Sequence, residues 1–228
     1  MGEKRTNMFI DRKYRLPRKW SNKILKQIAP FFTGNVVNIS AWEDKDKEGG
    51  CYKDYFINAD SYTITNYSGK RGITGVEGEN FLDLTSELDN KYINKFNVCF
   101  NHTTLEHVYN VNKAFSTICK MTKDIFILVV PFAQTQHESD NIKDYWRFTP
   151  SCLRKMFNDN NMKVVYENIN KHNNSGVYLF FVGTKNYEKW ENKLPNYRKL
   201  NSVGEWIGET KFYWIKKTLK NGKKYLKI

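Results

Sequence analysis

The stretch Asp144-Tyr145-Trp146-Arg147-Phe148-Thr149 is the part of the sequence from which a fold can be inferred. An unbroken apolar run over residues 125–130 precedes it and predicts a buried β-strand. Thr149 and Pro150 have the character of an N-cap and a first-turn proline, which predicts a helix over residues 151–157. Ligands of open α/β sheets bind beyond the carboxyl ends of the strands. We therefore expect an α/β protein with its functional site in the loop between this strand and this helix.

Strand and helix patterns alternate along the rest of the chain. Hydrophobic periodicity predicts strands over residues 36–40, 62–67, 80–84, 96–101, 162–166 and 177–182, and helices over residues 20–32 and 111–121. The last two strands are close in sequence and predict a hairpin at the edge of the sheet. This order divides the chain into a basic leader with a helix (1–32), an α/β domain (33–184) and a basic amphipathic C-terminal extension (185–228).

The composition limits the kinds of partner and the compartment. Lys and Arg total 37 against 24 Asp and Glu, a formal net charge of +13, so nucleic acid, acidic glycans and anionic lipid are all conceivable partners. The four cysteines are widely spaced and give no metal-ligand pattern. No run approaches the roughly 20 apolar residues of a membrane span, and the N-terminus is too polar for a signal peptide. We expect a cytoplasmic protein without a metal, soluble or peripheral at the inner membrane.

Two motifs resemble the class I S-adenosylmethionine-dependent methyltransferases. The segment FNVCFNHTTLEHV, residues 96–108, is similar to the fourth-strand motif of the type 11 group, in which a strand runs into a Leu-Glu-His turn. The later Val-Pro-Phe at residues 130–132, His137 and the segment 144–150 are similar to a subset of that group associated with surface-polysaccharide synthesis. The resemblance spans residues 33–184. It implies a Rossmann-like fold with a mostly parallel seven-stranded sheet and a terminal antiparallel strand.

The same resemblance implies a cofactor, S-adenosylmethionine, and a reaction. It implies methyl transfer to a sugar hydroxyl of a bacterial surface glycan or of its lipid-linked precursor. The predicted cofactor-binding residues follow the first four strands: Ser40, Trp42, Asn66, Asp83, Asn101 and His102.

The cofactor loop departs from the family pattern. After the first strand, family members carry an acid and a Gly-x-Gly-x-Gly loop, because glycine lets the backbone approach the cofactor closely. Here the matching residues are Asn38, Ser40, Trp42 and Asp44, and the Trp42 ring is large enough to occupy the adenosyl site. Asn66 replaces the acid that binds the ribose hydroxyls, whereas Asp83 matches the acid near the adenine amine. The sequence leaves open whether the cofactor site is used or filled.

The loop after the fifth strand supplies the predicted acceptor site. His137 is the candidate general base, because its ordinary pKa lies near working pH, and Asp144 is the candidate that orients it. Tyr145 and Trp146 are candidates for stacking on a sugar, and Arg147 is a candidate for binding an anionic group. The alternatives are a solvated surface histidine, aromatic residues that only pack, and an Arg147 that pairs with Asp144 or Glu138.

Charged residues elsewhere have simpler interpretations. Glu106 and His107 are expected at the start of a helix, where a carboxylate favours the helix dipole without a catalytic role. His102 ends the fourth strand, so it faces the predicted cofactor cleft. Residues 43–48 are most simply a solvated loop.

Two other functional classes remain open. One is a non-catalytic partner or binding module with a filled cofactor site. The other is an RNA-binding or RNA-modifying enzyme, suggested by the net charge and the 15% aromatic content, although the positive charge gathers in the terminal segments. In the C-terminal segment Phe212, Ile215 and Leu219 share one helical face among lysines, which predicts a helix that binds an anionic membrane surface or a partner enzyme.

Overall fold

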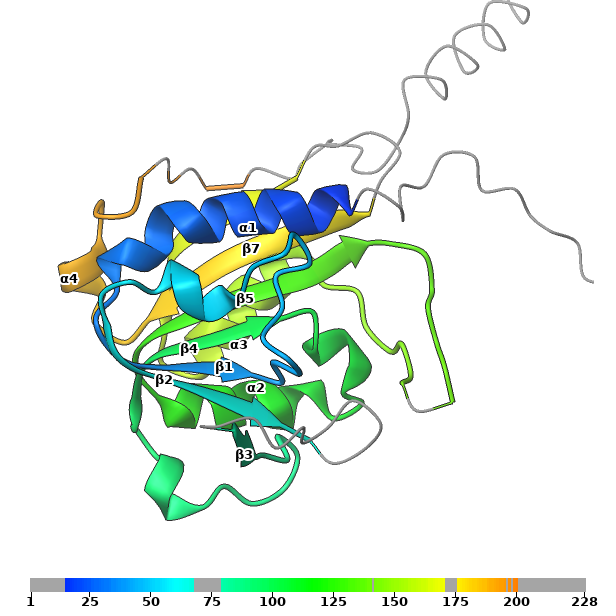
Figure 1. Cartoon of the computed structure of the whole chain (residues 1–228), viewed down its shortest axis with the longest axis horizontal. Coiled ribbons are helices and arrows are strands. Elements are labelled where there is room, and N and C mark those ends of the chain that lie inside the picture. Colours follow the sequence, from blue (N-terminus) through cyan, green and yellow to red (C-terminus); the bar gives the residue numbers. More distant parts are fainter. Residues whose placement is uncertain are drawn as a thin grey trace, which may run out of the picture.

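Seven strands form a single sheet in the order β3-β2-β1-β4-β5-β7-β6 (Figure 1). The computed structural model describes residues 15–67, 79–140, 142–170, 176–195, 197 and 199–200. The strands are β1 (Gly34–Ile39), β2 (Ala59–Asn66), β3 (Glu79–Phe81), β4 (Phe96–His102), β5 (Thr122–Ala133), β6 (Lys163–Ile169) and β7 (Val177–Thr184). β1 to β5 are parallel to their neighbours in that group, whereas β7 is antiparallel to both β5 and β6. The predicted mostly parallel sheet with a terminal antiparallel strand is confirmed.

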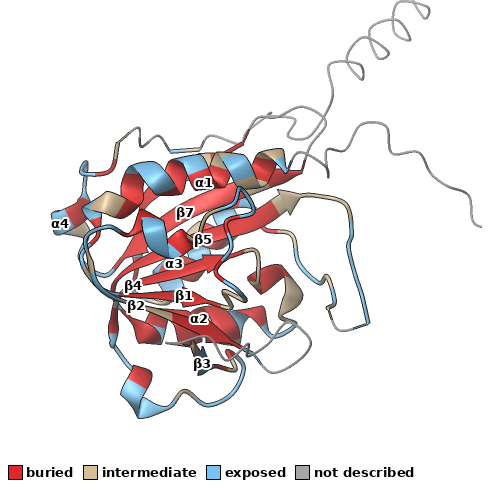
Figure 2. Ribbon diagram, in the orientation of Figure 1, coloured by how far each residue is buried: buried red, intermediate tan, exposed pale blue. Residues whose placement is uncertain are grey.

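Helices cover both faces of this sheet (Figure 1). The α-helices are α1 (Leu16–Ile28), α2 (Val111–Met121), α3 (Pro150–Asp159) and α4 (Tyr187–Trp190), and the 3-10 helices are η1 (Ala29–Phe31), η2 (Tyr52–Tyr55), η3 (Asn90–Tyr92) and η4 (Leu105–His107). Side chains alternate along β1, so Val36 packs with α1 and η2, and Val37 packs with α2 and α3. Figure 2 shows the resulting three layers, with buried strands between half-buried helices.

The two ends of the described chain belong to this core. α1 begins at Leu16, four residues before the predicted start, with Pro17 in its first turn. Ile24, Leu25 and Ile28 are spaced to fall on one face, and they are buried against the sheet. Trp190 and Leu194 are buried in the same cluster, so the first part of the predicted C-terminal extension packs on the domain.

Local signals explain where the helices near the site begin. The Thr149 hydroxyl accepts a hydrogen bond from the Cys152 N–H at 3.2 Å, which confirms the predicted N-cap of α3. The predicted start of an α-helix at Glu106 and His107 is wrong, because these residues lie in the three-residue 3-10 helix η4, and α2 begins only at Val111 after the Asn110 cap. Residues 40–58, which join β1 to β2 and are all described, contain no helix except η2.

Within the described residues, no helix is long and apolar enough to cross a membrane. The predicted amphipathic helix after residue 205 lies outside the described residues.

Candidate functional site

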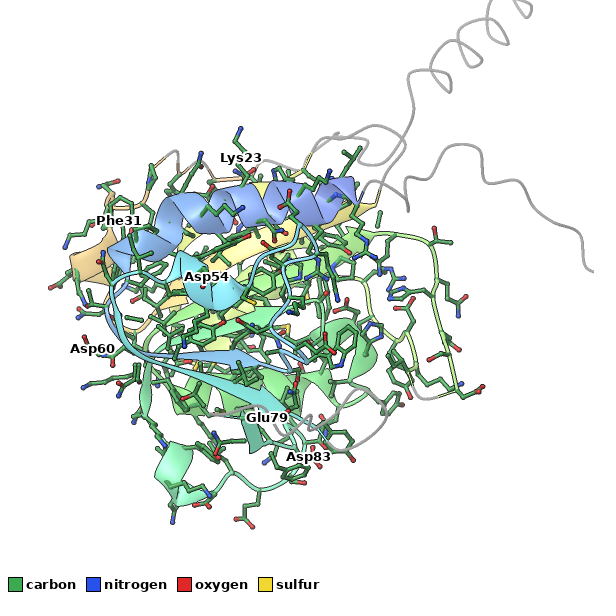
Figure 3. All side chains as sticks on the ribbon, in the orientation of Figure 1. Lys23, Phe31, Asp54, Asp60, Glu79 and Asp83 are labelled. Atoms are coloured by element: carbon green, nitrogen blue, oxygen red, sulfur yellow. The ribbon has the colours of Figure 1, made fainter. Side chains whose placement is uncertain are left out.

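The carboxyl ends of β1, β2, β4 and β5 point to the same edge of the sheet, on the right in Figure 1. This edge brings together the loop after β1, the end of β2, the end of β4 and the loop after β5, although they are far apart in sequence. The predicted site residues therefore come from neighbouring parts of the fold. Asp83 follows β3 and is labelled in the lower part of the view in Figure 3. Among the described residues, no group of three His, Cys, Asp or Glu side chains could hold a metal ion.

The loop after β1 has a backbone conformation suited to glycine. Ser40, Trp42 and Asp44 have φ angles of 58°, 51° and 57°, in the left-handed region. These are the three positions at which the resembled family carries glycine. A residue with a Cβ costs roughly 1–2 kcal/mol in this conformation, and the conformation is a marked exception for a residue as bulky as tryptophan. The surrounding structure thus holds this loop in a left-handed backbone conformation that its non-glycine side chains disfavour.

Asn66 joins the end of β2 to this loop. Its Oδ1 accepts a hydrogen bond from the Trp42 N–H at 2.6 Å, and its Nδ2 donates to the Trp42 carbonyl oxygen at 3.0 Å and to Glu79 Oε1 at 2.6 Å. Asn66 is buried. The amide that was predicted to bind ribose hydroxyls is therefore engaged with the chain's own backbone. The Trp42 ring is half-buried and lies 4.3 Å from Lys47 Nζ, within cation-π distance.

The charged loop of residues 43–48 is not simply solvated, which corrects the sequence-based interpretation. Asp44 is buried, and its carboxylate accepts hydrogen bonds from Asn38 Nδ2, the Tyr62 hydroxyl and the Lys53 N–H at 2.7–2.9 Å. Burial raises the pKa of Asp44 against the effect of these bonds. Asp46 is also buried and accepts from the Tyr55 hydroxyl at 2.6 Å and from two backbone N–H groups. The two carboxylates hold the loop against η2, and Asn22 Nδ2 of α1 donates to the Asp46 carbonyl oxygen at 2.9 Å.

Asp83 remains partly accessible. Its oxygens accept hydrogen bonds from the Thr85 N–H, the Thr85 hydroxyl and the Ser86 hydroxyl at 2.7–2.8 Å. Burial acts to raise the pKa of Asp83, but these bonds outweigh it and lower the pKa. Asp83 is thus an ionised acceptor at the position predicted to lie near an adenine amine.

The end of β4 carries an unsatisfied polar atom. Asn101 is fully buried, and its Nδ2 donates to the Ile39 carbonyl oxygen at 2.9 Å. Its Oδ1 has no hydrogen-bond partner among the described residues. An orphaned buried acceptor is uncommon in a folded protein, so this atom fits a donor supplied by a ligand or by water.

His102, the next residue, has partners for both ring nitrogens. Nε2 lies 2.8 Å from the Ser21 hydroxyl and Nδ1 lies 3.2 Å from the Thr103 hydroxyl. Burial and then the charge of Arg18 lower the pKa of His102 well below its ordinary value. The imidazole is neutral at physiological pH. Its predicted contact with a cofactor stays a prediction.

Asp144 organises the loop after β5. Its carboxylate forms a bidentate ion pair with Arg147 at 2.5 and 2.6 Å, accepts the His137 N–H at 3.0 Å, and lies 3.3 Å from His137 Nδ1. Burial acts to raise the pKa of Asp144, but the bonds from Arg147 and His137 outweigh it and lower the pKa to about 2. The structure thus contains an Asp144–His137 contact and the alternative ion pair with Arg147. The nearest partner of His137 Nδ1 is Gln134 Nε2, at 3.0 Å.

The aromatic residues of this segment divide between surface and core. Phe148 is buried, whereas the exposed fractions of Tyr145 and Trp146 are 47% and 38%. Trp146 Nε1 donates to the carbonyl oxygens of Val108 and Tyr109 at 3.0 and 3.2 Å, and the rings of Tyr109 and Tyr145 meet edge to face at 5.3 Å. Tyr145 and Trp146 are therefore available for ligand stacking, together with Tyr109, which the sequence analysis missed.

Glu106 has an environment that its sequence context does not indicate. It is fully buried on the turn η4, and neither carboxyl oxygen has a hydrogen-bond partner among the described residues. Burial raises the pKa of Glu106 to about 8. Its Oε1 lies 3.8 Å from Nε2 of His107, whose ring packs edge to face against that of His137 at 5.0 Å. The expected role of stabilising a helix dipole as a carboxylate is wrong, because Glu106 lies in a 3-10 helix of only three residues and its buried carboxyl has a raised pKa.

Arg18 is a further candidate that its sequence context does not indicate. The charged sequence around it predicts a basic leader, but α1 begins at Leu16 and carries Arg18 to the carboxyl end of β4. Its guanidinium donates to the Tyr52 hydroxyl and to the Thr103 hydroxyl, both at 2.9 Å. The helical spacing of apolar residues extends back to Leu16, and this signal could have placed Arg18 within α1.

No family model and no curated protein matches the sequence. Solved structures do match the fold. A 1,6-didemethyltoxoflavin-N1-methyltransferase of Burkholderia thailandensis, with its substrate and S-adenosylhomocysteine bound, is 16% identical with a TM-score of 0.51 over 73% of this chain and 80% of that one. Magnesium protoporphyrin IX methyltransferase of Synechocystis, with bound S-adenosylmethionine, is 9% identical with a TM-score of 0.52 over 81% and 86%.

A putative methyltransferase of Bacillus halodurans is 11% identical with a TM-score of 0.50 over 71% of this chain and 96% of that one. Such distant likeness carries information about architecture, and the strand order and the reversed β7 agree with it. The chain has the α/β Rossmann-like fold of the class I S-adenosylmethionine-dependent methyltransferases.

Proposed function

We propose that this chain is an S-adenosylmethionine-dependent methyltransferase that acts on a sugar hydroxyl of a bacterial surface glycan or of its lipid-linked precursor. The observation that carries the proposal is the placement of His137 against Asp144 beyond β5, on the same sheet edge as the loop after β1. A sugar hydroxyl must lose its proton as it attacks, and an imidazole oriented by a carboxylate is a suitable base. The exposed rings of Tyr145 and Trp146 lie in the same segment and suit the apolar face of a sugar.

The methionine end of the cofactor fits the residues at the ends of β1 and β4. The orphaned Asn101 Oδ1 is an acceptor for an ammonium group, and the left-handed backbone at Ser40, Trp42 and Asp44 follows a path suited to close approach. These residues would hold the amino-acid part of S-adenosylmethionine. When bound, the cofactor supplies a methyl group already activated by its sulfonium, so the protein mainly aligns the acceptor and removes a proton.

The ribose end fits less well in this conformation. Asn66 must release the Trp42 backbone before its amide can meet ribose hydroxyls. A neutral amide also binds hydroxyls more weakly than the carboxylate that it replaces. Asp83 offers an ionised acceptor for the adenine amine. We therefore infer a working cofactor site of low affinity.

The proposal is tested by following a labelled methyl group. Purified protein, S-adenosylmethionine with a labelled methyl and a lipid-linked glycan fraction should give labelled, base-stable O-methyl sugar. The His137→Ala variant should lose the transfer, whereas Gln136→Ala, on the same loop with an exposed side chain, should keep it. Labelled sugar formed equally by both variants would remove His137 from the mechanism, and the absence of any labelled product would contradict the acceptor class.

The closure of Asn66 on Trp42 also favours a second candidate, a non-catalytic binding module with the same fold. The two candidates differ in their response to S-adenosylhomocysteine. Ligand at 100 times its dissociation constant stabilises the folded state by about 2.7 kcal/mol, which a thermal shift resolves. A lack of stabilisation at millimolar ligand would favour the module.

A further inference from the structure

Arg18 is a half-buried cation without an acidic partner in the described part of the chain. Both of its terminal nitrogens donate to neutral hydroxyls, those of Tyr52 and Thr103. A guanidinium in such a position usually forms a fork with a carboxylate or a phosphate. Its charge is therefore available at the carboxyl edge of the sheet.

Two phenols stand beside this cation. The Tyr52 hydroxyl accepts from Arg18, so its own proton is left to donate, and the Tyr178 hydroxyl forms no hydrogen bond to any residue that the structure describes. The ring of His102 stacks on Tyr52 at 5.8 Å and meets the ring of Tyr178 edge to face at 6.1 Å. The imidazole thus packs against the rings of two tyrosines that come from different elements, η2 and β7.

The electrostatics of this group favour an anion. Burial raises the pKa of Tyr178 to about 12 and also raises that of Tyr52, and the charge of Arg18 opposes both shifts, so both phenols keep their protons. The nearby carboxyl of Glu106, with a pKa raised by burial, is mostly neutral at pH 7 and adds little negative charge. The neighbouring Arg147 is fully engaged with Asp144 through a bidentate pair.

We infer that Arg18, Tyr52 and Tyr178 form a binding site for an oxyanion carried by the acceptor, either a phosphate or a carboxylate. Arg18 thereby takes the role that the sequence analysis assigned to Arg147. The identity of the molecule that carries the oxyanion rests on the proposed function. The oxyanion site itself does not, because its three residues are in place without cofactor or glycan.

Calorimetric titration of the full chain with inorganic pyrophosphate, and separately with glucuronate, tests the site. We expect saturable binding of one of these probes, weakened about 10-fold or more by Arg18→Gln, because a charge-assisted fork is lost. Arg15→Gln is the matched control: it removes the same charge from an exposed position one turn away and should change the affinity less than about 2-fold. Tyr178→Phe should also weaken binding without changing the net charge.

The outcomes separate the sources of the oxyanion. Binding of pyrophosphate alone identifies a phosphate-linked acceptor, and binding of glucuronate alone identifies an acidic sugar. Binding of neither probe, or equal losses in Arg18→Gln and Arg15→Gln, would overturn the site. A titration with S-adenosylhomocysteine completes the test, since Arg18→Gln should leave that affinity unchanged. If Arg18→Gln weakens the binding of S-adenosylhomocysteine but not of the anion, Arg18 binds the cofactor carboxylate. That result would also overturn the inference.

These results are independent of methyl transfer. Circular dichroism and the unfolding midpoint of each variant establish that it is folded, and Arg18→Lys, which keeps the charge and loses the fork, should bind with intermediate affinity.

Discussion

The side-chain amide of Asn66 holds the backbone of Trp42 by two hydrogen bonds, accepting from its N–H at 2.6 Å and donating to its carbonyl oxygen at 3.0 Å. This contact ties the end of β2 to the loop after β1. It also occupies the amide that stands where the resembled family has its ribose-binding acid. The same residue therefore stabilises the loop and limits access to the proposed cofactor site.

Asn66→Ala should lower the free energy of unfolding by about 1–3 kcal/mol, because it leaves the Trp42 N–H and carbonyl without their buried partner. Urea unfolding measures this change. Asn58→Ala is the control, since the exposed Asn58 amide makes a single bond to the Pro30 carbonyl oxygen, and its loss should cost well under 1 kcal/mol. Equal effects of the two substitutions would contradict a special role for the Asn66–Trp42 contact.

Trp42→Gly should strengthen the binding of S-adenosylhomocysteine by about 10-fold, because glycine adopts the φ angle of 51° without strain and removes the ring beside the loop. Calorimetry measures the affinity. The control is Asn161→Gly, which relieves a similar φ angle of 57° far from the loop and should leave the affinity unchanged. Weaker binding by Trp42→Gly would show that the ring contacts the cofactor productively.

Glu106 makes the stability depend on pH. Its pKa is raised to about 8 in the folded chain, above its value near 4.5 in the unfolded chain, so the folded state binds the proton more tightly. The protonation of Glu106 therefore has its full stabilising effect below pH 4.5. As the pH rises from there to about 8, the free energy of unfolding falls by up to about 1.4 kcal/mol per pH unit. Glu106→Gln should remove that loss, so the variant should exceed the wild type in stability at pH 8–9. Parallel stability curves for the two proteins between pH 5 and 9 would contradict a buried neutral carboxyl.

His137→Ala should lower turnover about 100-fold or more and leave cofactor affinity unchanged, because a general base acts in the transition state and does not touch the cofactor. Single-turnover rates with labelled S-adenosylmethionine measure the effect. Unaltered turnover would reduce His137 to a surface residue of the loop after β5.

Most of the fold could be predicted from local patterns. The apolar run over residues 125–130 and the Thr149-Pro150 signal gave β5 and the start of α3, since both depend on short-range chemistry. The strand order could not come from those patterns and was implied by the resemblance instead. The start of α1 was missed because Arg15, Arg18 and Lys19 make its first turn look like a charged leader.

The site was harder to predict than the fold. Asp44 and Asp46 look like solvated acids in the sequence, and only the tertiary contacts with Tyr62 and Tyr55 make them buried acceptors. The burial of Glu106 depends likewise on segments distant in sequence, since its carbonyl oxygen accepts the N–H groups of Tyr145 and Trp146. The contact between His137 and Asp144 was predictable, because the two residues are only seven positions apart within one loop.

The most direct test of the central claim is a calorimetric titration of the full chain with S-adenosylmethionine. A functional methyltransferase with Asn66 closed on Trp42 should bind one equivalent saturably, with a free energy weaker than the roughly -8 kcal/mol of micromolar affinity. The absence of saturable binding at millimolar cofactor would contradict the assignment as a methyltransferase, and micromolar or tighter binding would contradict the low-affinity site.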